Sequence, residues 1–439
     1  MTAFVSGSQR RGRRAVLARA LSCALLAGSA TAGVVVGVAP AEAGVNIPAI
    51  PSENAADRTP GVVDSAAEPS AGVFELLQRG GQIFAGGRFT TVRNTAGRDK
   101  ARTYLFSFKR ATGAVTAFHP VLDGNVRALA LSPSGRFLYV GGDFRHFNGV
   151  AVNRLVRYDL EKKKVSPKFR FPTAVQRVSD LQLVDGRLVV AGTFPGGITA
   201  VRPDTGAVLP YFAAAQAAGN ETGYTTRIYR FAVNPTRDRM VVIGSFTSVG
   251  GQPRQQAAVL SLGDTAASVT DWTAPRFDED CNPRLRWYTR DVDWAPDGQH
   301  FAIVTTGAGA PGTTKLCDTV TWWQGVDAPD QEPVWVNYSG GDTFHSVRVT
   351  DRGVFVGGHF RWLDNPEGRD SAGPGAVDRQ GLGLIDTTTG KALDWNPTKS
   401  IEGGEGAYIL YFTRDGLWVG HFEQRISHEY HPGLGLLPY

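Results

Sequence analysis

The sequence feature that most constrains the fold is a repeat of about 50–60 residues that runs from Val73 to Tyr439. Each copy has an alternating apolar segment, a turn, and a second apolar segment that ends near Gly-Gly-x-Phe. A polar loop and two further short apolar segments follow. The marker phenylalanine recurs at Phe89, Phe144, Phe194, Phe246, Phe360 and Phe422. The interval between Phe246 and Phe360 is twice the others, and a copy without the marker fills it, with strands expected at 289–294 and 301–307.

Seven copies of a four-stranded unit of this length predict an all-β fold, a seven-bladed β-propeller over residues 73–439, with six or eight blades as alternatives. The clearest copy predicts strands at 127–131, 137–144, 154–160 and 165–172. The last copy offers only three segments, at 408–412, 417–422 and 433–437. We therefore expect residues 44–72 to form a linker whose 45–65 part can supply the missing strand and so close the ring of sheets.

Several copies resemble a known family. Leu138-Tyr139-Val140-Gly141-Gly142-Asp143-Phe144, Phe147-Asn148-Gly149 and Arg154-Leu155 are similar to the repeats of secreted bacterial β-propellers of the delta-60 repeat type. The segments 243–251 and 356–360 show the same likeness. The resemblance covers nearly all of the chain after residue 73. It implies a propeller fold, and it brings no shared catalytic motif with it.

The first 43 residues predict a secretory signal peptide. Five arginines lie before residue 20, an uncharged stretch covers 20–41, and Ala41-Glu42-Ala43 has the small-x-small pattern of a cleavage site. Arg13-Arg14 also fits a twin-arginine signal, and an uncleaved membrane anchor is the alternative. Cleavage would lower the formal net charge from +5 to about +1. We therefore expect a secreted or extracytoplasmic protein that binds no nucleic acid and has no stable membrane insertion.

Removal of this segment leaves two cysteines, Cys281 and Cys317. An even pair in an exported chain favours a disulfide bond, and two buried free thiols are the alternative.

The residue x of Gly-Gly-x-Phe is polar in six copies, as Arg88, Asp143, Thr193, Ser245, His359 and His421. The pseudo-rotation of a propeller would place these side chains in a ring around the axis. In one interpretation each of them bonds to the loop after its own strand. In the other, Arg88, Asp143, His359 and His421 contact a ligand; the structural interpretation is favoured because Ser and Thr serve loops well. Trp322 and Trp323 suggest an aromatic patch for sugars or peptides, with burial in the core as the alternative.

Two further clusters have the chemistry of metal ligands but not the spacing. His428-Glu429-Tyr430-His431, near His421 and Glu423, differs from the helical His-Glu-x-x-His motif, so a polar hairpin is expected there. Asp278-Glu279-Asp280 lacks the spaced ligands of a calcium loop, so a solvated acidic loop is expected. We expect no metal and no cofactor.

The sequence thus predicts an exported, non-catalytic binding or scaffold module for an unknown glycan, peptide or protein ligand. Two alternatives stay open. One is an extracytoplasmic enzyme of the lyase, glycosidase or lactonase type with its site at the channel mouth. The other is an adhesion or assembly partner that acts through its loops.

Overall fold

The structure is a computed structural model that describes residues 44–172, 174–219, 225–282, 285, 287–307, 314–397 and 406–439. Every described residue belongs to one compact unit within Val36–Tyr439. The predicted signal segment, residues 1–43, lies outside the described residues. Within the described ranges, no helix has the length and the apolar character needed to cross a membrane.

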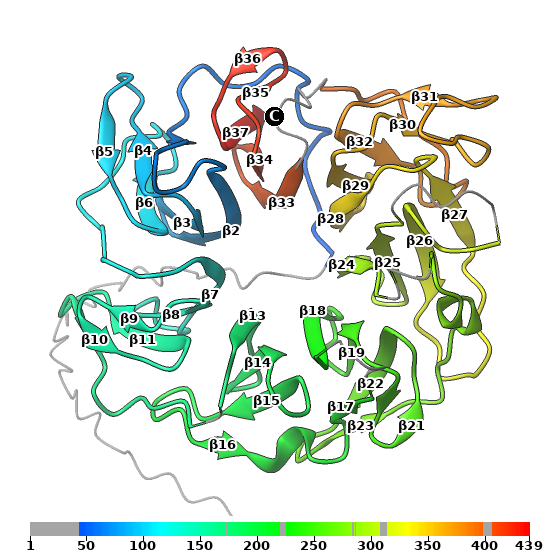
Figure 1. The fold of residues 1–439 in the computed structure, drawn as a ribbon, viewed down its shortest axis with the longest axis horizontal. Coiled ribbons are helices and arrows are strands. Elements are labelled where there is room, and N and C mark those ends of the chain that lie inside the picture. The colour runs from blue at the N-terminus through cyan, green and yellow to red at the C-terminus, as the bar shows by residue number, and fades with distance from the viewer. Residues whose placement is uncertain are drawn as a thin grey trace, which may run out of the picture. The chain divides into compact units, whose positions relative to one another are not determined.

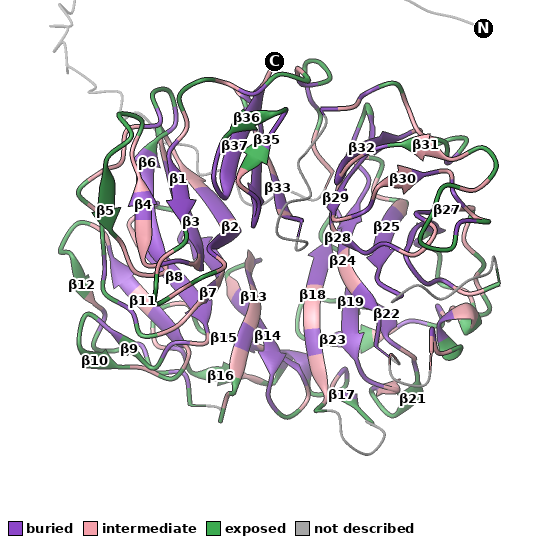
Figure 2. Ribbon diagram, turned by 45° about the horizontal axis from the view of Figure 1, so that its top comes forward, coloured by how far each residue is buried: buried purple, intermediate pink, exposed green. Residues whose placement is uncertain are grey.

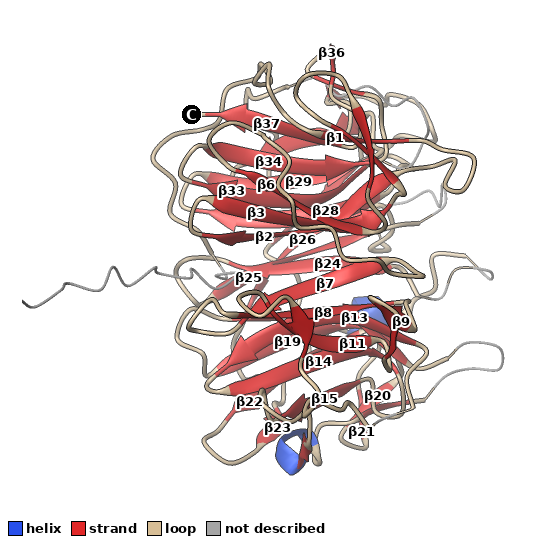
Figure 3. Ribbon diagram, turned by 90° about the vertical axis from the view of Figure 1, so that its left-hand side faces the viewer, coloured by secondary structure: helices blue, strands red, loops and turns tan. Residues whose placement is uncertain are grey.

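The described residues form antiparallel sheets, with two short 3-10 turns, η1 (Pro210–Phe212) and η2 (Pro275–Asp278), as their helical segments (Figure 3). In chain order, the first principal sheet consists of β2 (Gly72–Arg79), β3 (Gln82–Arg88) and β6 (Leu105–Lys109). The second consists of β7 (Val126–Leu131), β8 (Phe137–Gly142), β11 (Leu155–Asp159) and β12 (Lys164–Val165). The third consists of β13 (Arg177–Val184), β14 (Arg187–Thr193), β15 (Ile198–Val201) and β16 (Val208–Leu209). The next are β18 (Arg227–Val233), β19 (Arg239–Ser245), β22 (Ala257–Leu262) and β23 (Ala267–Val269); and β24 (Thr289–Trp294), β25 (His300–Thr305), β26 (Thr319–Gln324) and β27 (Trp335–Tyr338). The last are β28 (Phe344–Thr350), β29 (Gly353–Gly358) and β32 (Leu382–Ile385), and β33 (Ala407–Thr413), β34 (Gly416–His421) and β37 (Leu434–Pro438).

Small accessory sheets extend the connections between the second and third strands. They are β1 (Gly61–Val63) with β4 (Thr91–Arg93) and β5 (Asp99–Ala101); β9 (His146–Phe147) with β10 (Val150–Ala151); β17 (Ala217–Ala218) with β20 (Ser248–Val249) and β21 (Gln252–Pro253); β30 (Trp362–Leu363) with β31 (Val377–Asp378); and β35 (Arg425–Ile426) with β36 (Glu429–Tyr430).

The principal sheets of Val36–Tyr439 surround a common axis, and the first strand of each lies innermost (Figure 1). Each inner strand contacts the inner strands of the sheets before and after it, and β33 of the last sheet contacts β2 of the first, which closes the cycle. Hydrophobic clusters fill the space between neighbouring sheets, so most strand residues are buried and the accessory hairpins are exposed (Figure 2). One cluster, which includes Val73, Ile83 and Trp418, joins the first sheet to the last.

The predicted strand bounds agree with the observed strands where apolar and polar residues alternate clearly. The copy without the marker phenylalanine has its first strand at Thr289–Trp294, with the predicted bounds. In the clearest copy the bounds of the first three strands lie within two residues of the predicted positions. The fourth strand, predicted at 165–172, is wrong in extent, because the structure forms a strand only at Lys164–Val165.

The N-terminal segment lies along the outer edge of the last sheet without forming a regular strand there. The amides of Ser52 and Ala56 donate to the carbonyl oxygens of Pro438 and Leu436, at 2.6 and 2.8 Å, in an antiparallel sense. The amide of Asn54, which lies between them, donates to Oγ of Ser52 at 3.1 Å instead, so the pairing is limited to isolated bonds. The segment forms a strand only at β1, which pairs with β4 of the first copy.

Every inner strand carries a β-bulge near its start, and this bulge explains the glycines of the repeat. In the first sheet Val73 pairs with Gly87 and Glu75 pairs with Gly86, so Phe74 is the extra residue. A Cβ atom on Gly87 would overlap the carbonyl oxygen of Gly72. The same position opposite the bulge is a glycine in most of the other sheets, at Gly142, Gly192, Gly244 and Gly358. A bulge re-aims a side chain, so the Gly-Gly motif marks a place where the inner strand turns one side chain toward the axis.

Substitution of Gly87 by alanine is therefore expected to lower the free energy of unfolding by about 1–3 kcal/mol, since the new methyl group meets backbone that cannot yield easily. Gly81→Ala in the turn of the same hairpin is the matched control, because nothing lies within 4 Å of a Cβ atom there. Urea titration followed by tryptophan fluorescence compares the two. Equal stability of both variants would show that the bulge does not need glycine.

Candidate functional site

The bulged residues of the inner strands meet in one cavity of about 240 Å³ at the start of these strands. The bulge positions are Phe74, Arg127, Ser179, Tyr229, Arg290, His345 and Tyr408, and all of them line this cavity. Arg177, Arg227 and Thr289 complete its lining together with Arg230. We call this cavity the axial mouth. Because its residues come from every inner strand, it forms only when the ring of sheets closes.

Two of the arginines of the axial mouth share one carboxylate. Nε of Arg127 lies 2.8 Å from Oδ2 of Asp143, and Nε of Arg177 lies 2.5 Å from Oδ1 of the same residue. Burial alone would raise the pKa of Asp143, but the two guanidinium groups outweigh it and hold this pKa below its ordinary value. Arg127 also lies over the ring of Phe74, at 4.8 Å from its centroid.

Neither Arg227 nor Arg290 forms an ion pair with a carboxylate among the described residues, although the negative charge of Asp318 acts on Arg290 and partly opposes the lowering of its pKa. Arg227 lies 4.1 Å above the ring of Tyr229. Nε of Arg290 is enclosed without a hydrogen-bond partner in the described part of the chain. Burial lowers the pKa of the Arg290 guanidinium, and the positive charge of Arg227 adds to this effect. The mouth therefore holds excess positive charge on the side formed by β18 and β24.

Aromatic side chains form the neighbouring wall. The rings of His345 and Tyr408 stack at 4.3 Å with an interplanar angle of 14°. Tyr408 also meets Phe74 at 5.8 Å and Phe422 at 5.0 Å, both edge-on. Arg88 lies over the Phe422 ring, at 4.7 Å from its centroid. This wall places aromatic side chains beside the arginines of the axial mouth.

A second cavity of about 350 Å³ adjoins the axial mouth, because Arg177, Arg227 and Tyr229 line both. We call it the polar annex. Its other described lining residues are Gln176, Thr193, Thr225 and Ser245. Hydroxyl and amide groups dominate this lining, so the annex suits a ligand that carries hydroxyl groups.

Below the mouth, charged residues fill the axis around a small cavity of about 60 Å³. Glu75, Asp180, Asp291 and Asp293 provide the carboxylates, and Arg230 and Arg348 the guanidinium groups. We call these six residues the charge plug. Nη1 of Arg230 lies 3.3 Å from Glu75 Oε2 and 3.7 Å from Asp180 Oδ1, and its Nε lies 4.0 Å from Asp291 Oδ1. Arg230 lines both this cavity and the axial mouth, so the plug forms the floor of the mouth.

The aspartates of the plug also join neighbouring sheets. Asp180 of β13 accepts a hydrogen bond from the amide of Phe231 in β18, at 3.0 Å. Asp293 of β24 accepts one from the amide of Val349 in β28, at 2.8 Å. These bonds cross between inner strands that share no ladder, so the plug has a structural role in closing the ring.

Burial raises the pKa of both Glu75 and Asp293 to about 7, against the opposing effects of Arg230 and Arg348. The folded state therefore binds these protons more tightly than the unfolded state does, and their contribution to stability is lost as the pH rises from about 5 through 7. We expect the free energy of unfolding to fall between pH 5 and pH 8 by roughly 2 kcal/mol for each group. Denaturant titration at both pH values should show a smaller fall for Glu75→Gln than for the wild type. An unchanged fall in that variant would exclude Glu75 as a source.

The structure places residues of the predicted polar ring close to the axial mouth, but not all of the predicted residues occupy the position x of the repeat. Thr193 and Ser245 line the polar annex, and the rings of His359 and His345 lie 5.3 Å apart. Arg88 and Asp143 bond to Ser70 and to the inner-strand arginines, rather than to the loop after their own strands.

The last copy was aligned wrongly by one residue. His421 pairs with Ala407, in the register that glycine holds in the first sheet, where Gly87 pairs with Val73. Phe422 therefore occupies the position of the residue x, because its amide donates to the carbonyl oxygen of Gly406 just as the amide of Asp143 donates to that of Asn125. In the copy without the marker phenylalanine, Thr306 occupies the same position. The error arose because the final copy lacks one residue before its phenylalanine, which only the pairing reveals.

The two tryptophans of the predicted aromatic patch lie in the core. Trp322 is stacked between His300 and Trp335, with ring centroids 5.5 and 5.7 Å away, and is 4% exposed. Trp323 is fully enclosed beside Trp272. These side chains offer a ligand no surface, so we leave them out of the candidate site.

The clusters with metal-ligand chemistry lie elsewhere. His428 is exposed in the hairpin of β35 and β36, whereas His431 is buried and bonds through Nδ1 to Thr59 at 2.8 Å. Asp278 and Glu279 form an exposed stretch before Cys281. Among the described residues, no three His, Cys, Asp or Glu side chains are grouped so that they could hold a metal ion.

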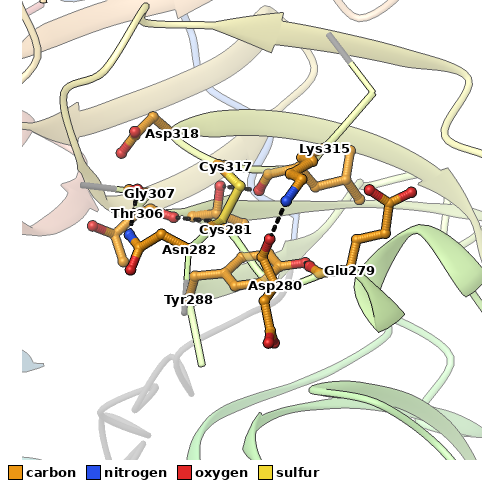
Figure 4. The surroundings of a disulfide bond; sticks show 12 residues. Glu279, Asp280, Cys281, Asn282, Tyr288, Thr306, Gly307, Lys315, Cys317 and Asp318 are labelled. Atoms are coloured by element: carbon orange, nitrogen blue, oxygen red, sulfur yellow. Dashed lines mark hydrogen bonds between the residues drawn. A yellow bond between two sulfur atoms is a disulfide. The ribbon is translucent and has the colours of Figure 1, made fainter. Parts of the chain in front are cut away.

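The predicted disulfide between Cys281 and Cys317 is confirmed, with Cα atoms 5.6 Å apart (Figure 4). It joins the loop before β24 to the loop before β26. Nζ of Lys315 donates to the carbonyl oxygen of Asp280 at 2.6 Å, and the hydroxyl of Tyr288 donates to that of Glu279 at 2.8 Å.

The bulged residues were missed by the sequence analysis, although a signal exists. Strict alternation fails at the start of each first strand, where two core-facing residues flank the bulge three positions apart instead of two, as Val73 and Leu76 or Val126 and Leu129 do. Two residues between a pair of inward positions are what a bulge produces.

Comparison with known proteins agrees with this architecture. A family model described as a domain of unknown function (DUF5122) beta-propeller matches residues 137–161, which run from the start of β8 to just beyond β11. No curated protein matches the chain. The match and the cycle of antiparallel sheets define a propeller-type repeat protein, of the kind that serves as a binding or scaffold module.

Proposed function

We propose that the protein is an exported, non-catalytic, seven-bladed propeller of the delta-60 type that binds an anionic ligand at the axial mouth. The observation that carries this proposal is the pair Arg227 and Arg290, which form no ion pair with a described carboxylate although Arg290 Nε is enclosed. The charge of Asp318 offsets that of Arg290 only in part, because the pKa of Arg290 stays below its ordinary value. An incompletely compensated charge in a partly desolvated cavity costs stability, and a bound anion lowers that cost.

Binding of dextran sulfate and of neutral dextran of equal length, measured by isothermal titration calorimetry, tests this function. We expect binding of the sulfated polymer only, with an affinity that falls as salt is added. The double variant Arg227→Gln/Arg290→Gln should lose it. The control Arg237→Gln, in the exposed turn between β18 and β19 where it pairs with Asp185 at 3.5 Å, should keep it. Binding that survives in the double variant would contradict the proposal.

Export is tested separately by mass spectrometry of the protein recovered outside the cytoplasm. A mature chain that begins at or near Gly44 is expected. An intact segment 1–43 would favour a membrane anchor instead.

An extracytoplasmic enzyme at the same mouth is the second candidate, favoured by the stacked His345 and Tyr408 beside Arg290, which combine groups able to exchange protons with a cation. Incubation with the bound ligand, followed by chromatography, decides between the two. Recovery of unchanged ligand supports the binding module, and conversion of the ligand supports the enzyme.

A further inference from the structure

We propose that the axial mouth binds the end of an acidic oligosaccharide, with a sugar carboxylate held by Arg227 and Arg290. This inference rests on the proposed function, because it names the class of anion that the mouth takes. Three features of the described residues carry it: the unpaired guanidinium groups, the composition of the walls, and the closed floor.

The first feature selects the position of the negative charge. Asp143 supplies one negative charge to Arg127 and Arg177 and engages Nε of both, whereas Arg227 and Arg290 form no such ion pair among the described residues, so a ligand carboxylate is directed to these two. These residues stand on the neighbouring inner strands β18 and β24. A guanidinium group matches the planar, two-oxygen geometry of a carboxylate.

The second feature selects a sugar rather than a lipid or a simple ion. Phe74 and Tyr408 line the mouth, so the C–H groups of a pyranose ring can contact aromatic side chains there. The polar annex continues from the arginines with Gln176, Thr193 and Thr225, which can bond to sugar hydroxyl groups. An acyl chain would find no apolar lining there.

The third feature selects the end of the chain. The charge plug closes the axis directly below the mouth, and the cavity within it holds only about 60 Å³. Arg230 lines both cavities, so its side chain lies between the axial mouth and the small cavity below it. A polysaccharide therefore cannot thread through the ring, and its terminal residue enters the mouth while the next residue lies toward the annex.

Isothermal titration with tri-galacturonic acid, its methyl ester and neutral galactotriose tests this inference. We expect the acid to bind at least tenfold more tightly than the ester or the neutral sugar, because the ester removes the charge and keeps the ring and the hydroxyl groups. Arg290→Gln and Arg227→Gln should each weaken binding of the acid at least tenfold, and Arg237→Gln should not.

A thermal melt accompanies each titration to separate binding from folding. Removal of an unpaired, partly buried charge should leave the melting temperature of Arg290→Gln equal to or above that of the wild type. A variant that loses both binding and stability would be replaced by Arg290→Lys, which keeps the charge but not the planar fork and should also bind the acid more weakly.

Oligogalacturonates of increasing length test end recognition. One protein molecule is expected per chain at every length, whereas binding within the chain would raise that number as the chain grows and would overturn the end-on geometry. Equal affinity for the acid and its ester would overturn the carboxylate assignment. If dextran sulfate binds through Arg227 and Arg290 while tri-galacturonic acid does not, the proposed function stands and this inference fails. If neither binds, both fail.

Discussion

Replacement of Arg230 by methionine is expected to lower the free energy of unfolding by about 3–5 kcal/mol, because it removes one of the two guanidinium groups that compensate the buried carboxylates of the charge plug. Glu75, Asp180 and Asp291 all lie within 4.0 Å of this guanidinium group. They belong to three different sheets, so their repulsion would act directly against closure of the ring.

Urea unfolding at pH 7, followed by fluorescence and circular dichroism, measures the effect. Arg237→Met, in the exposed turn of the same hairpin, is the control and should change stability by less than about 0.5 kcal/mol. The loss in Arg230→Met should shrink at pH 5, because the raised pKa of Glu75 allows its carboxylate to take up a proton there. Adding Glu75→Gln should recover part of the loss. A stability of Arg230→Met equal to that of the control would show that the plug does not hold the ring together.

Removal of the disulfide, as Cys281→Ser/Cys317→Ser, is expected to lower the free energy of unfolding by about 3–4 kcal/mol in the chain-entropy model. The bond spans a sequence separation of 36 residues and joins two loops of the copy that has lost the repeat signature. Both cysteines are buried beside Phe277 and Tyr288, so the serines would also meet an apolar environment.

Wild-type protein unfolded with and without a reductant provides the control, because it separates the covalent effect from that of the new hydroxyl groups. The reduced wild type should lose most of the expected 3–4 kcal/mol. Thiol labelling of the native, non-reduced protein should modify neither cysteine, and labelling of both would contradict the bond.

Much of the fold follows from local pattern. Alternation of apolar residues predicted the strands, including β24 in a copy without its marker phenylalanine, because a half-buried strand must alternate whatever its neighbours are. The even number of cysteines outside the predicted signal segment predicted the pair Cys281 and Cys317. The predicted ring of polar residues lay near the axial mouth for the same reason, since equal positions in a repeat occupy equal places around an axis.

The candidate site depended on contacts that no single copy contains. The bulged side chains of Phe74 and Tyr408 stand more than 300 residues apart in the chain, yet they share one cavity because β33 lies beside β2. Asp143 compensates Arg127 of its own sheet and Arg177 of the next, and this pairing across sheets decides which arginines remain unpaired. The strands, the repeats and the disulfide could be predicted from the residues alone, because they follow from local alternation and from the number of cysteines. The register of the last copy, the burial of Trp323 and the charge in the mouth required the folded molecule, because pairing and desolvation depend on residues brought together from distant parts of the chain.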